Sequence, residues 1–400
     1  NFFDGFRTSH EIQKVEVMEF DKLRDLVDQD ALKRFRQRAL NPDNPEIRGT
    51  AENPDIYFQH CEANNKFYDA MPDIVADYMA KISEITGRTY KPFNYYGAED
   101  AERVIVSMGS LSDVVYQTVN YLNGKGEKVG CINVHLYRPF SAKHLQAVLP
   151  KTVKKIAVID RTKEPGAMGE PLYLDIVNFA KTVGLDVDII GGRAGLGSKD
   201  VLPEDILPVF EELQKDHPMH GFTIGIVDDV TNLSLPRADK MPLDTTGLTA
   251  CKFWGFGSDG TVGANKSAIK IIGDHTDLYA QAYFAYDSKK SGGVTVSHLR
   301  FGTKPIDMPY LIDAADYIAC HRQSYVKRFD LLRGIKDGGT FMLNCTWSDE
   351  ELDHQLPARI KRAIAKHHVK FYTLNGDAIG QKLGLGTRIN MVMQAAFFAL

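Results

Sequence analysis

Apolar and polar positions alternate along the chain in two different patterns. From Glu16 to Leu40 and from Asn65 to Thr86, apolar residues recur at helical spacing, and the turn-forming run 41–45 ends the first stretch. From Ala101 onward, short β-branched runs alternate with amphipathic stretches. The first pattern predicts helices, and the second predicts strands joined by helical crossovers.

The second pattern predicts parallel sheets, because parallel strands need helical connections. In the middle of the chain we expect strands at 103–108, 128–136, 155–160 and 187–190, and helices at 112–122, 141–148, 169–183 and 203–215. A strand candidate at 223–227 then leads into a linker that ends near 249. Beyond it we expect strands at 251–256, 278–285, 294–299, 317–319, 340–344 and 370–373, and helices at 265–273, 322–333 and 356–366.

The predicted fold class is therefore α/β, with doubly wound parallel-sheet domains and a helical N-terminal linker segment. The 400 residues are too many for one ordinary core, so two or three units are expected. The first ten residues are typical of the end of a sheet domain whose body lies outside the chain. The chain begins without Met and stops inside an apolar, helix-like pattern, and we expect it to be a fragment.

Composition excludes several classes of protein. The 48 basic and 52 acidic residues give a net charge of -4, which provides no general attraction to nucleic acid or anionic lipid. The five cysteines lie far apart without a Cys-x-x-Cys pair, so we expect neither a disulfide framework nor an iron–sulfur site in this chain. This use of cysteine is typical of a protein in the reducing cytoplasm. No apolar run reaches the ~20 residues that cross a bilayer, which predicts a protein that is neither membrane-bound nor exported.

A glycine-rich loop between an expected strand and an expected helix is the clearest candidate for chemistry. Gly255, Gly257 and Gly260 satisfy the pattern G-x-G-x-x-G. Absent Cβ atoms allow close approach to backbone N–H groups, and a helix start carries partial positive charge. Because Lys266 and the hydroxyls of Ser258 and Thr261 add donors, the loop favours a phosphate site over a plain turn.

The strand expected from Leu278 ends in a second candidate, the run 287–293, which contains Lys289 and Lys290. In a dinucleotide fold this strand end meets the ribose, and neighbouring cations suit a phosphorylated ribose. NADP and coenzyme A both carry one, so the residues alone leave these two ligands open. A solvated turn is the alternative.

Other constellations give weaker signals. Arg161 and Arg193 follow strands of the middle unit, where they are either contacts to a partner or structural salt bridges. His60 and His321 each adjoin a cysteine, but adjacent residues rarely ligate one ion, and we expect no metal site. Neither G-x-S-x-G nor His-Glu-x-x-His occurs, so hydrolase templates find no support.

The segments 257–266, 286–293 and 298–302 closely resemble pyruvate:ferredoxin (flavodoxin) oxidoreductase. The segments 3–11, 137–140 and 386–390 extend this resemblance over essentially the whole chain. It implies an enzyme that oxidatively decarboxylates pyruvate on thiamine diphosphate with Mg. That enzyme passes electrons through [4Fe–4S] clusters to ferredoxin or flavodoxin and releases acetyl-coenzyme A and CO2.

The resemblance also gives each part of the chain a role. Residues 1–94 are similar to the tail of the first, pyrimidine-binding-like domain and its linker helices, residues 95–227 to a transketolase C-terminal-like domain, and residues 228–400 to a truncated coenzyme A-binding domain. Coenzyme A would be held by Ser258, Asp259, Gly260, Thr261, Val262, Gly263, Ala264, Asn265, Lys266, Lys289, Lys290 and Asn390.

The resemblance implies that no catalytic residue lies in this chain, which alone would be inactive. Its expected partners are the missing domains of the same enzyme and a second copy in a homodimer, besides the electron acceptor. Two other functions share its sequence features: an NADP-dependent Rossmann-type oxidoreductase, and an interaction module without a ligand.

Overall fold

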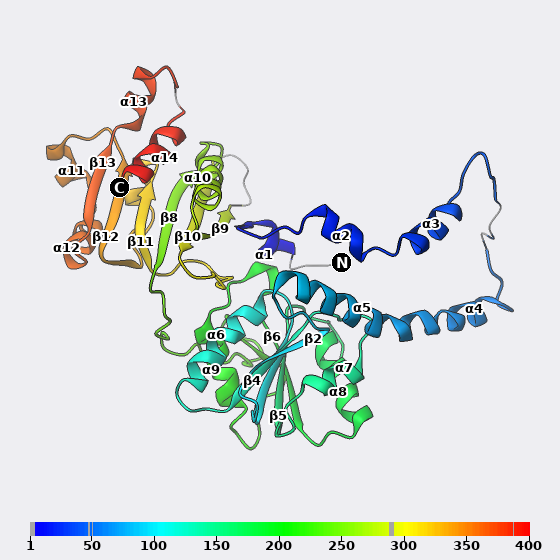
Figure 1. Cartoon of the computed structure of the whole chain (residues 1–400). Coiled ribbons are helices and arrows are strands. Elements are labelled where there is room, and N and C mark those ends of the chain that lie inside the picture. Colours follow the sequence, from blue (N-terminus) through cyan, green and yellow to red (C-terminus); the bar gives the residue numbers. More distant parts are fainter. Residues whose placement is uncertain (1–4, 47–48, 50, 288–291, 387) are drawn as a thin grey trace. The chain divides into compact units, whose positions relative to one another are not determined.

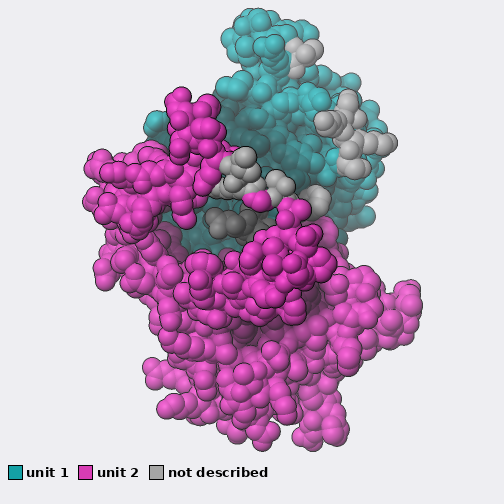
Figure 2. Space-filling model, turned by 90° about the vertical axis from the view of Figure 1, so that its right-hand side faces the viewer, with its two compact units in different colours: residues 1–15, 242–400 teal, residues 16–241 magenta. Residues whose placement is uncertain are grey.

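The computed structural model describes residues 5–46, 49, 51–287, 292–386 and 388–400. The chain forms two compact units, shown in separate colours in Figure 2: residues 16–241, and residues 1–15 together with 242–400. The first is called here the middle unit and the second the C-terminal unit. Figure 1 labels their elements.

The middle unit contains a six-stranded sheet in the order β2-β4-β3-β5-β6-β7. Its strands are β2 (Phe93–Gly97), β3 (Arg103–Ser107), β4 (Val129–Val134), β5 (Lys155–Asp160), β6 (Asp188–Arg193) and β7 (Phe222–Thr223). All neighbours are parallel except β2, which pairs antiparallel with β4. The helices are α5 (Asn65–Thr86), α6 (Leu111–Asn123), α7 (Ala142–Val148), α8 (Pro171–Val183) and α9 (Pro203–Glu212), with a 3-10 turn η1 (Leu196–Ser198).

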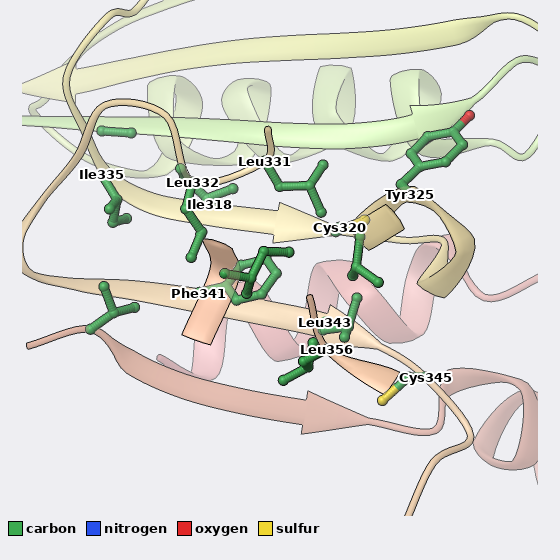
Figure 3. Close-up of a cluster of buried hydrophobic side chains, with 14 of the residues drawn as sticks. Ile318, Cys320, Tyr325, Leu331, Leu332, Ile335, Phe341, Leu343, Cys345 and Leu356 are labelled. Carbon is green, nitrogen blue, oxygen red and sulfur yellow. The ribbon is translucent and has the colours of Figure 1, made fainter. Parts of the chain in front are cut away.

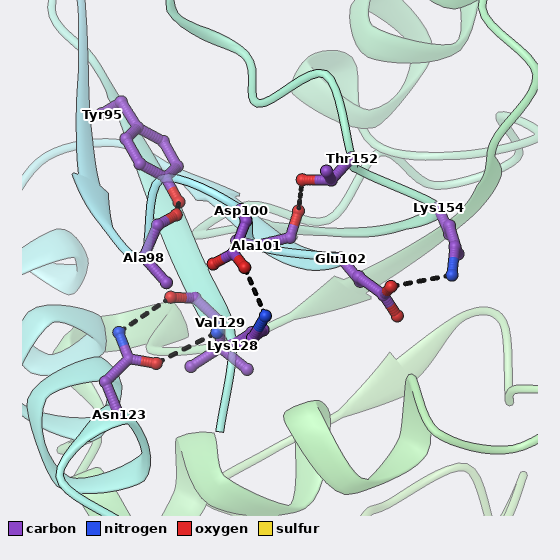
Figure 4. Close-up of polar contacts among 10 residues, drawn as sticks. All are labelled: Tyr95, Ala98, Asp100, Ala101, Glu102, Asn123, Lys128, Val129, Thr152 and Lys154. Atoms are coloured by element: carbon purple, nitrogen blue, oxygen red, sulfur yellow. Dashed lines mark hydrogen bonds and ion pairs between the residues drawn. The ribbon is translucent and has the colours of Figure 1, made fainter. Parts of the chain in front are cut away.

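Apolar side chains of the central strands build the core of this sheet. Val104, Ile132 and Ile156 are almost wholly buried and pack against Leu172 and Ile176 of α8. Polar contacts connect the residues at the amino-terminal edge of this sheet, as Figure 4 shows. Lys128 pairs with Asp100, Lys154 pairs with Glu102, and the side-chain amide of Asn123 forms hydrogen bonds with the backbone of Val129. These exposed ion pairs contribute little free energy each, so burial dominates the stability of the sheet.

Three further helices precede this α/β fold: α2 (Phe20–Leu26), α3 (Gln29–Gln37) and α4 (Tyr57–Ala63). Asp28 caps α3 by accepting a hydrogen bond from the Ala31 backbone at 2.8 Å. None of the three helices has a buried residue.

The C-terminal unit contains a seven-stranded mixed sheet in the order β1-β9-β10-β8-β11-β12-β13. Its strands are β1 (Glu11–Gln13), β8 (Leu248–Phe256), β9 (Tyr279–Tyr286), β10 (Val294–Gly302), β11 (Ala315–Cys320), β12 (Ile335–Asn344) and β13 (Lys370–Leu374). Its helices are α1 (Gly5–Ser9), α10 (Thr261–His275), η2 (Gln323–Lys327), α11 (Asp349–Gln355), α12 (Ala358–Lys366), α13 (Gly376–Lys382) and α14 (Asn390–Ala399).

The two faces of this sheet have separate cores. On one face Ala268 and Ile269 of α10 and Met393 of α14 join Phe253 and Leu299 of the strands. The other face is shown in Figure 3, where Ile318, Phe341 and Leu343 lie among residues of the following loops and helices, such as Leu331 and Leu356. A sheet that is covered on both faces is expected to have apolar strands, and these strands are mostly buried.

The α/β class is confirmed, but neither sheet is wholly parallel. β10 runs antiparallel to both β8 and β9, because β9 and β10 are consecutive strands joined by a short connection instead of a helix. β8, β11, β12 and β13 are parallel neighbours. The β1 strand, from the start of the chain, pairs antiparallel with β9.

Two of the expected elements differ from the structure. The helix predicted at 322–333 is wrong: only the 3-10 turn η2 forms. Val326 is buried within η2, and Leu331 and Leu332 are buried in the loop that follows it. The apolar spacing of this segment therefore reflects packing under the sheet and not a helical face. The strand predicted at 223–227 is limited to Phe222–Thr223, because Gly225 at φ 78° turns the chain away.

Candidate anion-binding site

The candidate loop lies where the path of the chain through the C-terminal sheet changes direction. After β8 the chain builds β9 and β10 on one side of this strand, and then β11 on its other side. Ligands of open α/β sheets bind outside the carboxyl ends of strands at such a point. Residues 257–260 follow the carboxyl end of β8, and His321 follows that of β11.

A single carboxylate shapes the loop. Asp259 accepts hydrogen bonds from the backbone N–H groups of Phe256 and Thr261, both at 2.8 Å. Ser258 and Gly260 adopt left-handed backbone angles, with φ of 77° and 83°. The turn closes the loop and directs the chain into α10, whose first turn begins at Thr261.

Gly255 is required by packing. A Cβ atom at this position would lie 2.6 Å from both Cβ and Oγ1 of Thr261, closer than real Cβ contacts. The start of α10 can therefore lie against β8 only because residue 255 has no side chain. At Gly263 an added Cβ meets nothing within 4 Å, so this glycine faces open space.

A buried hydrogen-bond network holds the start of α10 next to the ends of the neighbouring strands. The Thr261 hydroxyl and His321 Nδ1 lie 2.8 Å apart, and the carbonyl of His321 accepts a bond from the Asn344 amide at 3.1 Å. Asn344 Oδ1 in turn accepts from the backbone N–H of Gly376 at 2.8 Å. The network joins the carboxyl ends of β11, β12 and β13 to the start of α10.

The imidazole in this network is neutral at physiological pH. Burial lowers the pKa of His321 to about 4, and the Asp259 carboxylate offsets only part of that effect. A neutral ring can exchange one hydrogen bond with the Thr261 hydroxyl without placing a buried charge beneath the loop.

The predicted binding segment 258–266 divides into three groups. Thr261, Ala264 and Asn265 are buried and serve the packing of α10. Asp259 and Val262 are partly exposed. The exposed members lie on the outer side of the loop and helix; they are Ser258, Gly260, Gly263 and Lys266. A ligand could reach the second and third groups.

Asn390 is brought to the loop from 130 residues away. Its side-chain amide donates to the carbonyl of Gly260 at 3.5 Å, from the start of α14. The predicted residues 258–266 and Asn390 therefore share one place in the fold. Lys289 and Lys290 lie outside the described residues.

Two cations flank this place in the described part of the chain. Lys266 Nζ lies 5.4 Å from the centroid of the Phe284 ring, and the guanidinium of Arg322 lies 4.2 Å from the centroid of Phe256. Sequence reasoning missed Arg322, which directly follows His321 at the end of β11. Together with the positive end of α10, these cations favour an anion over a neutral ligand.

At the equivalent edge of the middle sheet, the start of α8 is occupied by side chains of the same unit. The buried Asp160 carboxylate accepts from the backbone N–H groups of Leu172 and Tyr173 at 3.0 and 3.2 Å, at the start of α8. Arg161 donates to Ser110 at 2.7 Å, and Arg193 donates to Glu170 at 3.3 Å. Burial raises the pKa of Asp160 to about 6, although these two backbone bonds oppose the shift.

A cavity of about 540 Å³ also lies in the middle unit, beside the end of β6. Its walls combine Arg193, Lys163 and Lys199 with apolar side chains of 224–233. Within the described residues, no group of three His, Cys, Asp or Glu side chains is placed to hold a metal ion. No helix among them has the length and apolar character needed to span a bilayer.

The fold and site define a class: α/β proteins in which a glycine-rich loop leads from a strand into an accessible helix start at the carboxyl edge of a sheet. Three family models match the chain. Pyruvate ferredoxin/flavodoxin oxidoreductase matches 250–400, pyruvate:ferredoxin oxidoreductase core domain II matches 101–206, and the thiamine diphosphate-binding domain of pyruvate flavodoxin/ferredoxin oxidoreductase matches 1–80.

Relatives match over all of this chain. The chain is 63% identical over 401 residues to pyruvate-flavodoxin oxidoreductase of Klebsiella pneumoniae and 58% identical over 400 residues to pyruvate:ferredoxin oxidoreductase of Moorella thermoacetica, covering 34% of each. It is 50% identical over 409 residues to the mitochondrial pyruvate dehydrogenase (NADP+) of Euglena gracilis, covering 22% of it.

The chain therefore belongs to the pyruvate ferredoxin/flavodoxin oxidoreductase family. It spans about one third of the length of the two bacterial relatives.

Proposed function

We propose that this chain is the coenzyme A-positioning part of a pyruvate:ferredoxin (or flavodoxin) oxidoreductase. Residues 228–400 would bind coenzyme A, residues 95–227 would form a transketolase C-terminal-like domain, and residues 1–94 would end the first domain and link it onward. The proposal rests on family membership and on the open start of α10. At the start of α8, by contrast, Asp160 uses the helix N–H groups internally, and Arg161 and Arg193 bond to Ser110 and Glu170.

The open start of α10 suits the phosphates of coenzyme A. The first N–H groups of a helix have no partner within it, and only that of Thr261 is used by Asp259. The N–H groups of Val262 and Gly263 remain at the positive end of the helix, beside the exposed glycine. Lys266 is exposed one turn further on, and with Lys289 and Lys290 it would neutralise phosphate charge.

The contribution of the chain to the reaction is placement. Holding the phosphates lets the thiol reach the reacting carbon in the right orientation, which replaces a bimolecular encounter. Ser258, Gly260 and Asn390 would border the bound phosphates, and the buried network through His321 keeps their backbone in place. The full-length protein would convert pyruvate and coenzyme A to acetyl-coenzyme A and CO2 and pass the released electrons to ferredoxin or flavodoxin.

Thiamine diphosphate, Mg and [4Fe–4S] clusters would be held by other parts of the full-length protein. When bound, thiamine diphosphate supplies the stabilised carbanion that decarboxylation requires. The matched segment 1–80 consists, where described, of mostly exposed helices and one short strand without a buried polar cradle. No step of thiamine chemistry is therefore assigned to these residues. We further propose a homodimer in the cytoplasm.

Two other functions make different binding predictions. An NADP-dependent oxidoreductase would use the same loop; the Euglena relative is named for NADP+, but the chain covers only 22% of it, so that name does not assign NADP to this part. An interaction module would bind neither nucleotide. The open cation-flanked helix start favours a ligand over the interaction module.

Calorimetric titration of the full-length protein with coenzyme A, dephospho-coenzyme A and NADPH separates these functions. We expect coenzyme A to bind, dephospho-coenzyme A to bind more weakly, and NADPH not to displace coenzyme A. Displacement by NADPH would favour the NADP enzyme, and no heat with any of the three would favour the interaction module. Either result would contradict the proposal.

A further inference from the structure

The segment 16–71, called here the arm, carries large apolar side chains with nothing covering them. Every described residue from Lys33 to Met71 is exposed. Phe35 is 66% exposed and Phe58 is 69% exposed. Figure 1 shows α3 and α4 as separate helices. Large exposed apolar side chains concentrated in one segment indicate an interaction surface.

The apolar residues of the arm recur at helical spacing, which is typical of a helix face that packs against another part of a protein. Leu32 and Phe35 lie three positions apart on α3, and Phe67, Met71 and Ile74 lie on one stripe of α5. A different stripe of α5, which includes the buried Pro72, packs on the middle unit. The Phe67–Ile74 stripe is thus a second apolar face without a partner in the described chain.

The short helices α3 and α4 favour a partner that covers the arm permanently. Isolated helices below ~12–15 residues are marginal in water, and α3 has 9 residues and α4 has 7. Phe35 and Phe58 would also be an aggregation hazard if a partner covered them only in passing. These features favour a partner that is present from synthesis onward over an electron carrier that binds and leaves.

The basic residues of α3 indicate what kind of surface the partner presents. Arg34 and Arg36 flank Phe35 on α3, and neither forms an ion pair with a described residue. If α3 packed against α3 of a second copy, the basic side chains of the two helices would face and repel one another. An apolar hollow with carboxylates at its rim would instead accept Phe35 and pair with these basic side chains.

We propose that the arm docks, through Phe35, Phe58 and Phe67, into an acid-rimmed apolar surface on the remainder of its own full-length polypeptide. The two bacterial relatives extend well beyond this chain, which covers 34% of each, so a full-length protein has ample chain to supply that surface. This inference concerns assembly of the protein and does not depend on coenzyme A binding.

Site-specific photo-cross-linking in the full-length protein tests this docking. A benzophenone amino acid replaces Phe35, and the same amino acid at Gln37, on the opposite side of α3, is the matched control. We expect position 35 to give a cross-linked product at the mass of a single chain. Peptide mapping should place the acceptor outside residues 1–400, beside Asp or Glu, and position 37 should give much less product.

Three results would overturn the inference. A product at twice the chain mass would assign the face to a second copy. An acceptor within residues 1–400 would mean that the arm folds back on this chain, and equal or absent product at positions 35 and 37 would mean that no specific face exists. Hydrogen exchange of the unsubstituted protein gives an independent measurement: α3 and α4 should be protected, and exchange at the rate of unstructured chain would contradict docking.

Discussion

The two sheets place a helix start at the same kind of edge but use it differently. In the middle unit the start of α8 is occupied by the buried Asp160, and Arg161 and Arg193 bond to neighbouring groups of the chain. In the C-terminal unit Asp259 occupies only the first N–H of α10, and Gly263 and Lys266 remain exposed. The start of α8 is closed by side chains of its own unit, whereas the start of α10 is left accessible.

The difference shows that a position at the carboxyl edge of a sheet does not by itself leave a helix start accessible. Arg161 and Arg193 were predicted as contacts or salt bridges, and the structure gives both of them internal partners. What distinguishes the second edge is backbone left accessible by glycine. The following predictions test this comparison, from the largest expected effect to the smallest.

Filling the packing glycine should damage the open edge most. Gly255→Ala places a methyl group 2.6 Å from Thr261 in the buried interior, and such overpacking costs about 1–3 kcal/mol. We expect a lower unfolding temperature of the full-length protein and loss of coenzyme A binding. Thermal unfolding and calorimetry check both, and an unchanged protein would mean that the contact between β8 and α10 is loose.

The closed edge should depend on its carboxylate. In Asp160→Asn an amide N–H₂ replaces one acceptor, which leaves a buried backbone N–H of α8 unpaired at a cost of about 1–3 kcal/mol. Coenzyme A binding should be unchanged, because the proposed site lies on the other sheet. Reduced affinity with normal stability would show that the two edges are coupled.

The pH dependence of this variant has a defined sign. The folded pKa of Asp160, about 6, lies above its ordinary value of 3.8, so its protonation favours the folded state. That contribution is present below pH 3.8 and is lost as the pH rises through about 6. The unfolding temperature of wild type should therefore fall relative to that of Asp160→Asn as the pH rises between these values. A constant difference between the two unfolding temperatures would contradict the assignment.

His321 should give the opposite pH dependence in the C-terminal unit. Its folded pKa of about 4 lies below the ordinary 6.5, so the unfolded chain binds the proton first as the pH falls. Stability should decrease from pH 6.5 toward 4, and His321→Asn should reduce that slope. Burial also lowers the pKa of His298, so part of the slope should remain. An identical slope in the variant would exclude a neutral, buried His321.

Lys266 should affect binding but barely affect the fold. The side chain is exposed, so Lys266→Ala should leave the unfolding temperature within error. We expect coenzyme A affinity to fall about tenfold at low salt and less at high salt, since screening weakens exposed charges. Lys270→Ala, another exposed lysine of α10, is the matched control. Equal effects of the two substitutions would show general attraction only.

The order of strands and helices could be predicted from sequence because it depends on local periodicity. The strand at 155–160 and the helix at 65–86 coincide with β5 and α5. The antiparallel β10 and the loops that replace the helix at 322–333 depend on which distant segments pair, and no local pattern specifies that. The parallel-sheet rule also left β1 and its pairing with β9 unforeseen.

The geometry of the candidate loop could be predicted only in part for the same reason. The glycine spacing and Lys266 are visible in the sequence, whereas Asp259 as the turn-forming acceptor and the bond between Thr261 and His321 depend on contacts across 60 residues. Asn390 was placed through the family resemblance, and the structure brings it to Gly260. Whether it contacts coenzyme A stays a prediction, as do the roles of Lys289 and Lys290.

The most direct test of the open edge is the coenzyme A affinity of full-length Gly263→Ala, measured together with its unfolding temperature. An alanine in a helix is favoured over glycine by about 1 kcal/mol, and its Cβ meets nothing in the protein. We predict an unfolding temperature that is unchanged or higher, with coenzyme A affinity reduced at least tenfold because the methyl group occupies the approach of the phosphate. Unchanged affinity in this folded variant would contradict the account.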